Sequence, residues 1–249
     1  MSPNVNSAKL AFIRDVYVDQ HVGTKILPAA SLVPQTDNPL SIVSYFFLYK
    51  SLKTLNAICI LSESGHAEDA LVLGRTIFEL TTYLLWIASP DTVEQRRVRA
   101  ESFIYDGDRQ RVVKLKELEV LKKQGKCLSW INEIEALNPV FETIPMPVNF
   151  TPLKNLKNMA EELGDEWEGW YHFLYWSVSK LTHPSGIGSH SYLHEVDQEE
   201  EDSRALTVGL TMQFYLTSTA LSLLDLEKFR SPLEEAMQQF VALSAPPTL

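Results

Sequence analysis

Two long apolar segments, joined by one short turn, constrain the fold of this 249-residue chain more than any other feature. Residues 40–63 and 66–89 carry apolar side chains on most sides of a helix with a 3.6-residue period. Asp37 or Asn38 can cap the first helix, and Gly65 can end it. The pattern therefore predicts two buried helices that form an antiparallel hairpin.

The same helical period runs through the rest of the sequence, which carries no strand pattern of any strength. Residues 22–38 and 140–152 are interrupted by prolines and are predicted as connectors, and residues 186–202 as a polar loop. Further helices are predicted over 5–21, 91–124, 127–139, 153–164, 166–183, 204–229 and 232–244. We therefore expect an all-α fold, a single bundle of seven to nine helices.

The length of the chain allows one large domain or two small ones. The connector at 140–152 could divide the chain, but the helices on both sides of it are apolar enough to need each other. We expect one helical domain over 1–249, in which the C-terminal helices within 204–245 pack on a core of about 40–190.

Charge and composition disfavour several classes of protein. The formal net charge is −10, concentrated at 165–168 and 195–202, which argues against broad, non-specific binding to nucleic acid. Cys59 and Cys127 lie too far apart to indicate a disulfide framework or a zinc site. The N-terminus lacks a signal-peptide pattern, and the apolar run at 80–88 is shorter than the ~20 residues that cross a bilayer. We expect a soluble cytoplasmic protein without a membrane partner.

One stretch is locally basic in spite of the acidic total. Seven cations lie within about 20 residues: Arg96, Arg97, Arg99, Arg109, Arg111, Lys114 and Lys116. Interspersed carboxylates at Glu94, Glu101 and Glu117 favour a solvated helix face with ion pairs over a nucleic-acid surface.

Arg75 and Glu79 are the charged residues of the second hairpin helix that need a structural explanation. They are four residues apart and share one helix face, although most of their neighbours are apolar. An isolated buried charge is costly, so the two side chains either pair with each other or line a polar pocket.

A stripe of polar side chains follows the aromatic helix near residue 175. Tyr171, Tyr175 and Ser179 recur every four residues, and His183 continues the series just before Pro184. Because the residue before proline disfavours helical geometry, the imidazole is expected at the C-terminal end of the helix, where the dipole favours a cation. A protonated histidine near tyrosine hydroxyls suits proton transfer to or from a phosphodiester. A plain helix terminus is the structural alternative.

Other chemistry has weaker support in the sequence. Ser179 lacks the nucleophile elbow and oxyanion loop of a serine hydrolase. A metal site remains open, built from His183, His190 and His194 with Glu79 or Glu195, although the paired motifs of metal enzymes are missing. No cofactor is expected.

Arg14 and His21 formally fit the R-x4–6-H motif of the HEPN ribonucleases. In that family the motif lies in a later helix, beside a dimer groove, whereas here it falls in the first predicted helix. With six histidines in the chain, a chance match is easy.

Two motifs in the right order make the chain resemble a bacterial family known as domain of unknown function 5677. That family has a lysine-bearing helix, a glycine turn, an Arg-x3-Glu helix and, later, a tyrosine-rich helix that ends in Ser-x3-His-Pro-Ser. The resemblance covers roughly 40–190 and implies an all-helical fold without an established reaction. The matching positions are Lys50, Lys53, Gly65, Ala70, Arg75, Glu79, Tyr171, Tyr175, Ser179, His183, Pro184 and Ser185.

The resemblance also implies that the two motifs converge, which would bring Arg75, Glu79, Tyr175, Ser179 and His183 to one cleft. The leading hypothesis is a metal-independent ribonuclease-like toxin or phage-defence effector that binds RNA locally. His183 would then be the acid or base, Arg75 the phosphate clamp and Glu79 the orienting group.

Two alternatives stay open, and the sequence does not decide whether the chain is an enzyme. One is a non-catalytic helical module that binds a protein or a ligand, with the acidic 195–202 stretch as a dock for a basic partner. The other is a metal-dependent enzyme that uses the histidines and carboxylates named above. A homodimer is compatible with either, because the long helices are apolar on more than one side.

Overall fold

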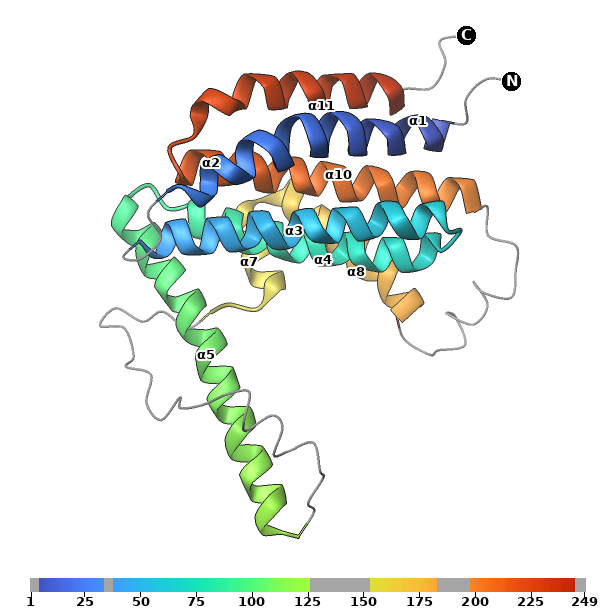
Figure 1. The fold of residues 1–249 in the computed structure, drawn as a ribbon. Helices are drawn as coiled ribbons and strands as arrows, with labels where there is room; N and C mark the ends of the chain where they lie inside the picture. The colour runs from blue at the N-terminus through green and yellow to red at the C-terminus, as the bar shows by residue number, and fades with distance from the viewer. Residues whose placement is uncertain (1–4, 34–37, 126–152, 183–197, 245–249) are drawn as a thin grey trace. The chain divides into compact units, whose positions relative to one another are not determined.

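A computed structural model describes residues 5–33, 38–125, 153–182 and 198–244 of the chain (Figure 1). These residues form nine α-helices and no strand, which confirms the predicted all-α bundle. The chain divides into two compact units, Met1–Pro90 with Lys154–Leu249, and Asp91–Leu153. The prediction of a single domain stays a prediction.

The predicted hairpin is present as α3 (Pro39–Glu63) and α4 (Ala67–Ala88), joined by a three-residue turn. The side chain of Asn38 caps α3 by accepting a hydrogen bond of 3.1 Å from the Leu40 amide. Gly65 has a φ of 75°, the left-handed conformation that glycine adopts without strain, and the chain reverses there. Local signals in the sequence are thus sufficient for this element.

The long helix α10 (Gln198–Leu223) packs along both helices of the hairpin and completes the core of the larger unit (Figure 1). The Thr81 hydroxyl donates a hydrogen bond of 3.1 Å to the Met212 carbonyl, which ties α4 to α10. Gly209 lies so close to α3 that an added Cβ would meet Ile58 Cδ1 at 2.9 Å.

The N-terminal helical segment is longer than predicted. It runs through α1 (Val5–Ala11), the π-helix η1 (Phe12–Ile26) and α2 (Leu27–Ser31). The predicted connector is therefore wrong for its first ten residues, 22–31. Val22, Ile26 and Ala30 are buried at four-residue intervals, and Pro28 lies in the first turn of α2.

The bounds of α10 also differ from the prediction. It begins at Gln198, so residues 198–202 belong to a helix and not to the predicted polar loop. Glu199, Glu200 and Glu201 occupy its first turn, where the helix dipole favours negative charge. The helix ends at Leu223, six residues early, and the 3-10 turn η2 (Glu227–Phe229) follows Asp225, whose φ is 54°.

The other predicted helices agree with the structure where it describes them. In the larger unit these are α7 (Leu156–Leu163), α8 (Asp165–Thr182) and α11 (Arg230–Ser244). The predicted helix at 127–139 and the connector at 140–152 lie outside the described residues.

The smaller unit contains α5 (Val93–Lys123), which carries the basic cluster. Side-chain ion pairs link Arg97 to Glu101 at 3.0 Å and Lys114 to Glu117 at 2.8 Å. These contacts support the interpretation of this surface as a solvated helix face with ion pairs.

Among the described residues, α4 is the one helix long and apolar enough to cross a membrane. More than half of its most apolar stretch is buried inside the protein. The expected cytoplasmic location stays a prediction.

We expect Gly209→Val to destabilise the larger unit, because the new side chain must displace Ile58 and Leu55, both fully buried. Overpacking of this kind costs about 1–3 kcal/mol. Urea unfolding should show a lower midpoint with an unchanged slope. Gly169→Val is the matched control, because a Cβ at this α8 position meets nothing within 4 Å. Equal midpoints for the two variants would contradict the close approach of α10 to α3.

Candidate functional site

The arginine cluster consists of Arg75 and Glu79 on α4 and Tyr175 on α8. Arg75 Nε donates a hydrogen bond of 3.1 Å to Glu79 Oε1, and the Tyr175 hydroxyl donates one of 2.9 Å to the same oxygen. The guanidinium lies over the Tyr175 ring, with Cζ at 3.9 Å from the ring centroid. Each member thus contacts the other two, although α4 and α8 are distant in the sequence.

A buried tryptophan fixes α8 against α4. The Trp167 indole N–H donates a hydrogen bond of 2.8 Å to the Thr82 hydroxyl, and its ring stacks on Phe78 at 5.6 Å. Two helical turns further along α8, Tyr175 lies beside Arg75 and stacks on Tyr171 at 4.5 Å. The polar stripe of α8 is therefore positioned by its apolar anchor.

The surroundings set the charge of each member. Burial raises the pKa of Tyr175 to about 12, and Glu79 acts in the same direction while Arg75 opposes it. Burial also disfavours the charge of Arg75, but Tyr175 and Glu79 outweigh this effect and raise its pKa. At neutral pH, Tyr175 is therefore a neutral hydrogen-bond donor, and Arg75 is a firmly held cation.

Arg75 retains the capacity to bind an anion. Its side chain is 22% exposed and that of Glu79 is 35% exposed, so solvent reaches both. A guanidinium carries five N–H donors, and the partners of Arg75 among the described residues are Glu79 and Tyr175. The remaining donors suit the planar, two-point recognition of a carboxylate or phosphate.

Three of the five predicted site residues are thus brought together, and two cannot be placed. Arg75 and Glu79 form the ion pair of the first interpretation and are also partly exposed, whereas the polar pocket of the second interpretation stays a prediction. The backbone of Ser179 belongs to α8, but its side chain and the whole of His183 lie outside the described residues.

The metal hypothesis receives no test. The described residues contain no group of three or more histidine, cysteine or acidic side chains that could hold a metal ion. His183, His190, His194 and Glu195 all lie outside the part of the chain that the structure describes.

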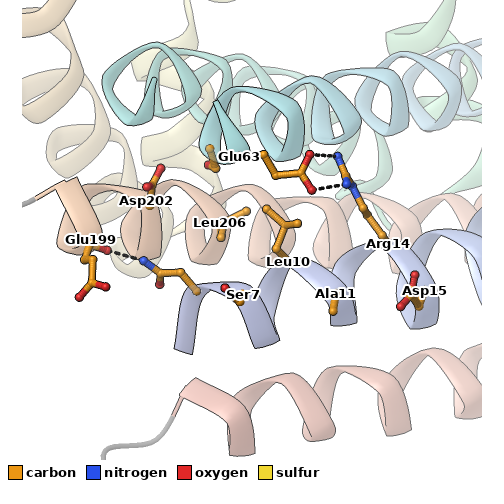
Figure 2. Close-up of a pocket in the computed structure, with 11 residues that line it drawn as sticks. Ser7, Leu10, Ala11, Arg14, Asp15, Glu63, Glu199, Asp202 and Leu206 are labelled. Atoms are coloured by element: carbon orange, nitrogen blue, oxygen red, sulfur yellow. Dashed lines mark hydrogen bonds and ion pairs between the residues drawn. The ribbon is translucent and has the colours of Figure 1, made fainter. Parts of the chain in front are cut away.

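Arg14 and His21 do not form one site within this chain. Arg14 makes a two-point ion pair with Glu63 at the end of α3 (Figure 2). His21 has a pKa lowered by burial and by Lys25, and the charge of Glu235 on α11 opposes this shift. The two members of the formal R-x6-H motif therefore interact with different helices, α3 and α11.

A second hollow, missed by the sequence analysis, lies between α1, the end of α3 and the start of α10 (Figure 2). It has a volume of about 580 Å³. Its charged lining consists of Arg14, Asp15, Glu63, Glu199 and Asp202. At its lining, the Asn6 amide donates a hydrogen bond of 2.7 Å to the Glu199 carbonyl. Burial raises the pKa of Asp202, and Glu68 adds to this shift. No single sequence segment signals this hollow, because its lining comes from four elements, α1, η1, α3 and α10.

Comparison with protein families matches residues 41–202 to a family of unknown function, DUF5677. Because the match covers more than half of the chain, the protein belongs to this family, as the two motifs indicated. The comparisons with curated proteins and with solved structures give no match. The matched segment includes every member of the arginine cluster.

The raised pKa of Tyr175 predicts a pH-dependent stability. The folded protein favours the neutral phenol, so this contribution is present below about pH 10 and is lost as the pH rises towards about 12. In urea unfolding, the difference in unfolding free energy between wild type and Tyr175→Phe should therefore shrink over this pH range.

Glu79→Gln keeps a hydrogen-bond acceptor but removes the negative charge beside Tyr175. The Tyr175 phenolate should then form at a lower pH, which ultraviolet absorbance can measure. If the difference in unfolding free energy between wild type and Tyr175→Phe stayed constant up to pH 12, the part-buried position of Tyr175 beside Glu79 would be contradicted.

Proposed function

We propose that this protein is a metal-independent, ribonuclease-like effector that acts in the bacterial cytoplasm as a toxin or in phage defence. The arginine cluster would bind a phosphate of RNA, and His183 would transfer the proton. The observation that carries the proposal is the Arg75 guanidinium. It is part-exposed, stacked on Tyr175 and held by Glu79, and its contacts with the described residues leave some of its N–H donors unused.

Each member of the cluster has a distinct role in this mechanism. Arg75 binds the phosphate and stabilises the charge that develops on it. Glu79 holds the guanidinium through Nε, and Tyr175 fixes the carboxylate with a second hydrogen bond to the same oxygen. Because its pKa is raised, Tyr175 acts as a neutral donor and does not serve as the base.

Besides the protein and its substrate, the proposed reaction uses only solvent water, as the partner for one proton. The RNA 2′-hydroxyl attacks the adjacent phosphorus, and the bond to the 5′-oxygen breaks. His183 takes the proton from the 2′-hydroxyl while water protonates the leaving 5′-oxygen, or His183 protonates the leaving oxygen while water takes the proton of the nucleophile. The products are a 2′,3′-cyclic phosphate and a 5′-hydroxyl, which form without a water nucleophile.

The acidic total restricts how RNA would bind. With a net charge of −10, the protein repels a polyanion over most of its surface. Recognition would therefore depend on few phosphate contacts, and its salt dependence would be shallow, with a slope of about one for each phosphate contacted. This charge favours a specific site in a structured or single-stranded RNA over general binding.

A non-catalytic module that binds an anionic ligand is the second candidate. The pairing of Arg75 with Glu79 favours it, because a satisfied ion pair can hold helices together without any chemistry. The two candidates share the arginine cluster and differ in the role of His183.

The decisive test is cleavage of cellular RNA by purified protein in the presence of EDTA. We expect Arg75→Ala to lower the rate about 10²–10³-fold, as the loss of a transition-state donor does. His183→Ala should lower it about 10²–10⁴-fold, as the loss of a general acid or base does. Arg97→Ala is the matched control, because Arg97 forms the same four-residue ion pair, with Glu101 on α5.

The cleavage products and the fold of each variant distinguish the ribonuclease, the metal-dependent enzyme and the binding module. Cyclic phosphate ends from wild type, together with folded but inactive variants, would support the proposal. Activity abolished by EDTA would favour the metal-dependent alternative. If folded wild type leaves RNA intact and does not slow the growth of cells that express it, the catalytic proposal fails and the binding module takes its place.

A further inference from the structure

The outer face of α3 carries a regular stripe of exposed side chains. Four are large and apolar, with exposed fractions of 37% for Ile42, 48% for Phe46, 46% for Tyr49 and 57% for Ile60. Two polar residues, Lys53 and Asn56, fill the gaps and are also exposed. The intervals between successive members of the stripe are four, three, four, three and four residues.

Alternating intervals of four and three residues are the pattern by which one helix packs along another helix. They keep the side chains in a narrow band, because the average spacing of 3.5 residues is close to one helical turn. The opposite side of α3 already packs on α4 and α10. The stripe is therefore a second seam on the same helix, with the geometry to receive a helix.

The intervals between members of the stripe are the same when they are read in either direction about the level of residue 51, although the residue types are not. Residues 42 and 60, 46 and 56, and 49 and 53 are equidistant from that level. A two-fold axis through this level would bring each residue to its counterpart on a second copy. Such mutual pairing is the requirement of an isologous interface in a homodimer.

We propose that a second copy of the chain docks on this stripe, with the two α3 helices antiparallel. Ile42 then meets the partner subunit's Ile60 at both ends of the seam. Phe46 lies opposite the partner subunit's Asn56, and Tyr49 lies opposite the partner subunit's Lys53. This interface is separate from the arginine cluster and does not depend on the proposed reaction.

The charges near the centre of the stripe fit this register. Lys53 Nζ lies over the Tyr49 ring at 5.5 Å within one chain, and the same cation–π contact can form across the two-fold axis. The two Lys53 residues lie four residues apart along the helix axis, or about 6 Å, so their ammonium groups need not collide. No carboxylate lies between residues 40 and 62. The dimer should consequently tighten as salt rises, because salt screens the lysines on the two copies from each other.

The length of the seam sets the strength of the interaction. A 25-residue helix is about 37 Å long and about 10 Å wide, so one helix face supplies on the order of 400 Å². A standard stable interface buries about 800 Å² on each partner. The dimer should therefore be reversible and depend on protein concentration.

Two substitutions test the seam and its direction in the full-length protein. Ile42→Lys or Ile60→Glu alone places a charge against an isoleucine of the partner, and each should weaken dimerisation at least ten-fold in sedimentation velocity. In the antiparallel register the double variant I42K/I60E forms two ion pairs across the interface, and it should recover most of the lost affinity. Val241→Lys is the control, because it charges another exposed apolar residue, on α11.

Three results would overturn the proposal. One is a wild type that stays monomeric throughout a concentration series that reaches several hundred micromolar. Another is a dimer that Ile42→Lys and Ile60→Glu leave intact, because another face would then form it. The third is a folded double variant that fails to recover, because the helices would not be antiparallel about residue 51. Circular dichroism of each variant separates loss of the dimer from loss of the fold.

Discussion

The close approach of α10 to the α3–α4 hairpin is the contact on which the rest of the larger unit depends. Glycines make it possible, because a Cβ at Gly209 would meet Ile58 at 2.9 Å, and one at Gly74 would meet Val208 at 3.3 Å. Thr81 reinforces it with a hydrogen bond to the α10 backbone. Arg75 follows Gly74 directly, and successive helical residues point about 100° apart. The contact that seats Gly74 against α10 therefore also directs Arg75 away from it, towards α8.

The arginine cluster can exist at this position because its charges are only partly removed from water. A fully buried ion pair bears a desolvation penalty that can exceed its Coulombic gain. Arg75 and Glu79 avoid most of this penalty, since both side chains retain exposure, while the Tyr175 ring covers one face of the guanidinium. The apolar anchor at Trp167 holds that ring in place. The cluster is thus anchored on the protein side and partly exposed to solvent, which is the combination that the proposed ligand site needs.

Elements with strong local signals could be predicted from the sequence, whereas elements set by tertiary packing could not. The hairpin follows from its apolar periodicity and its glycine turn, and Asn38 caps it as one of the two expected residues. Residues 22–31 looked like a connector because the burial of Val22 and Ile26 becomes evident only after the segment packs. The acidic run at 198–202 looked like a loop, although its charges stabilise a helix start. For the site, spacing placed Arg75 and Glu79 on one face, but their meeting with Tyr175 was implied only by the family resemblance, because it depends on how α8 packs.

Glu79 matters both for the stability of the arginine cluster and for the proposed binding of an anion to Arg75. One of its oxygens accepts hydrogen bonds from both Arg75 and Tyr175, so the carboxylate holds the guanidinium and competes with any incoming anion for it. A dianionic or bridging phosphate can use the remaining N–H donors without displacing Glu79, whereas a ligand that needs Nε must break the pair. If the cluster binds an anion as proposed, the ligand would approach the guanidinium from its outer edge. Glu79 would then select for strongly charged ligands, because a weakly charged ligand gains too little from the remaining donors to overcome repulsion by Glu79.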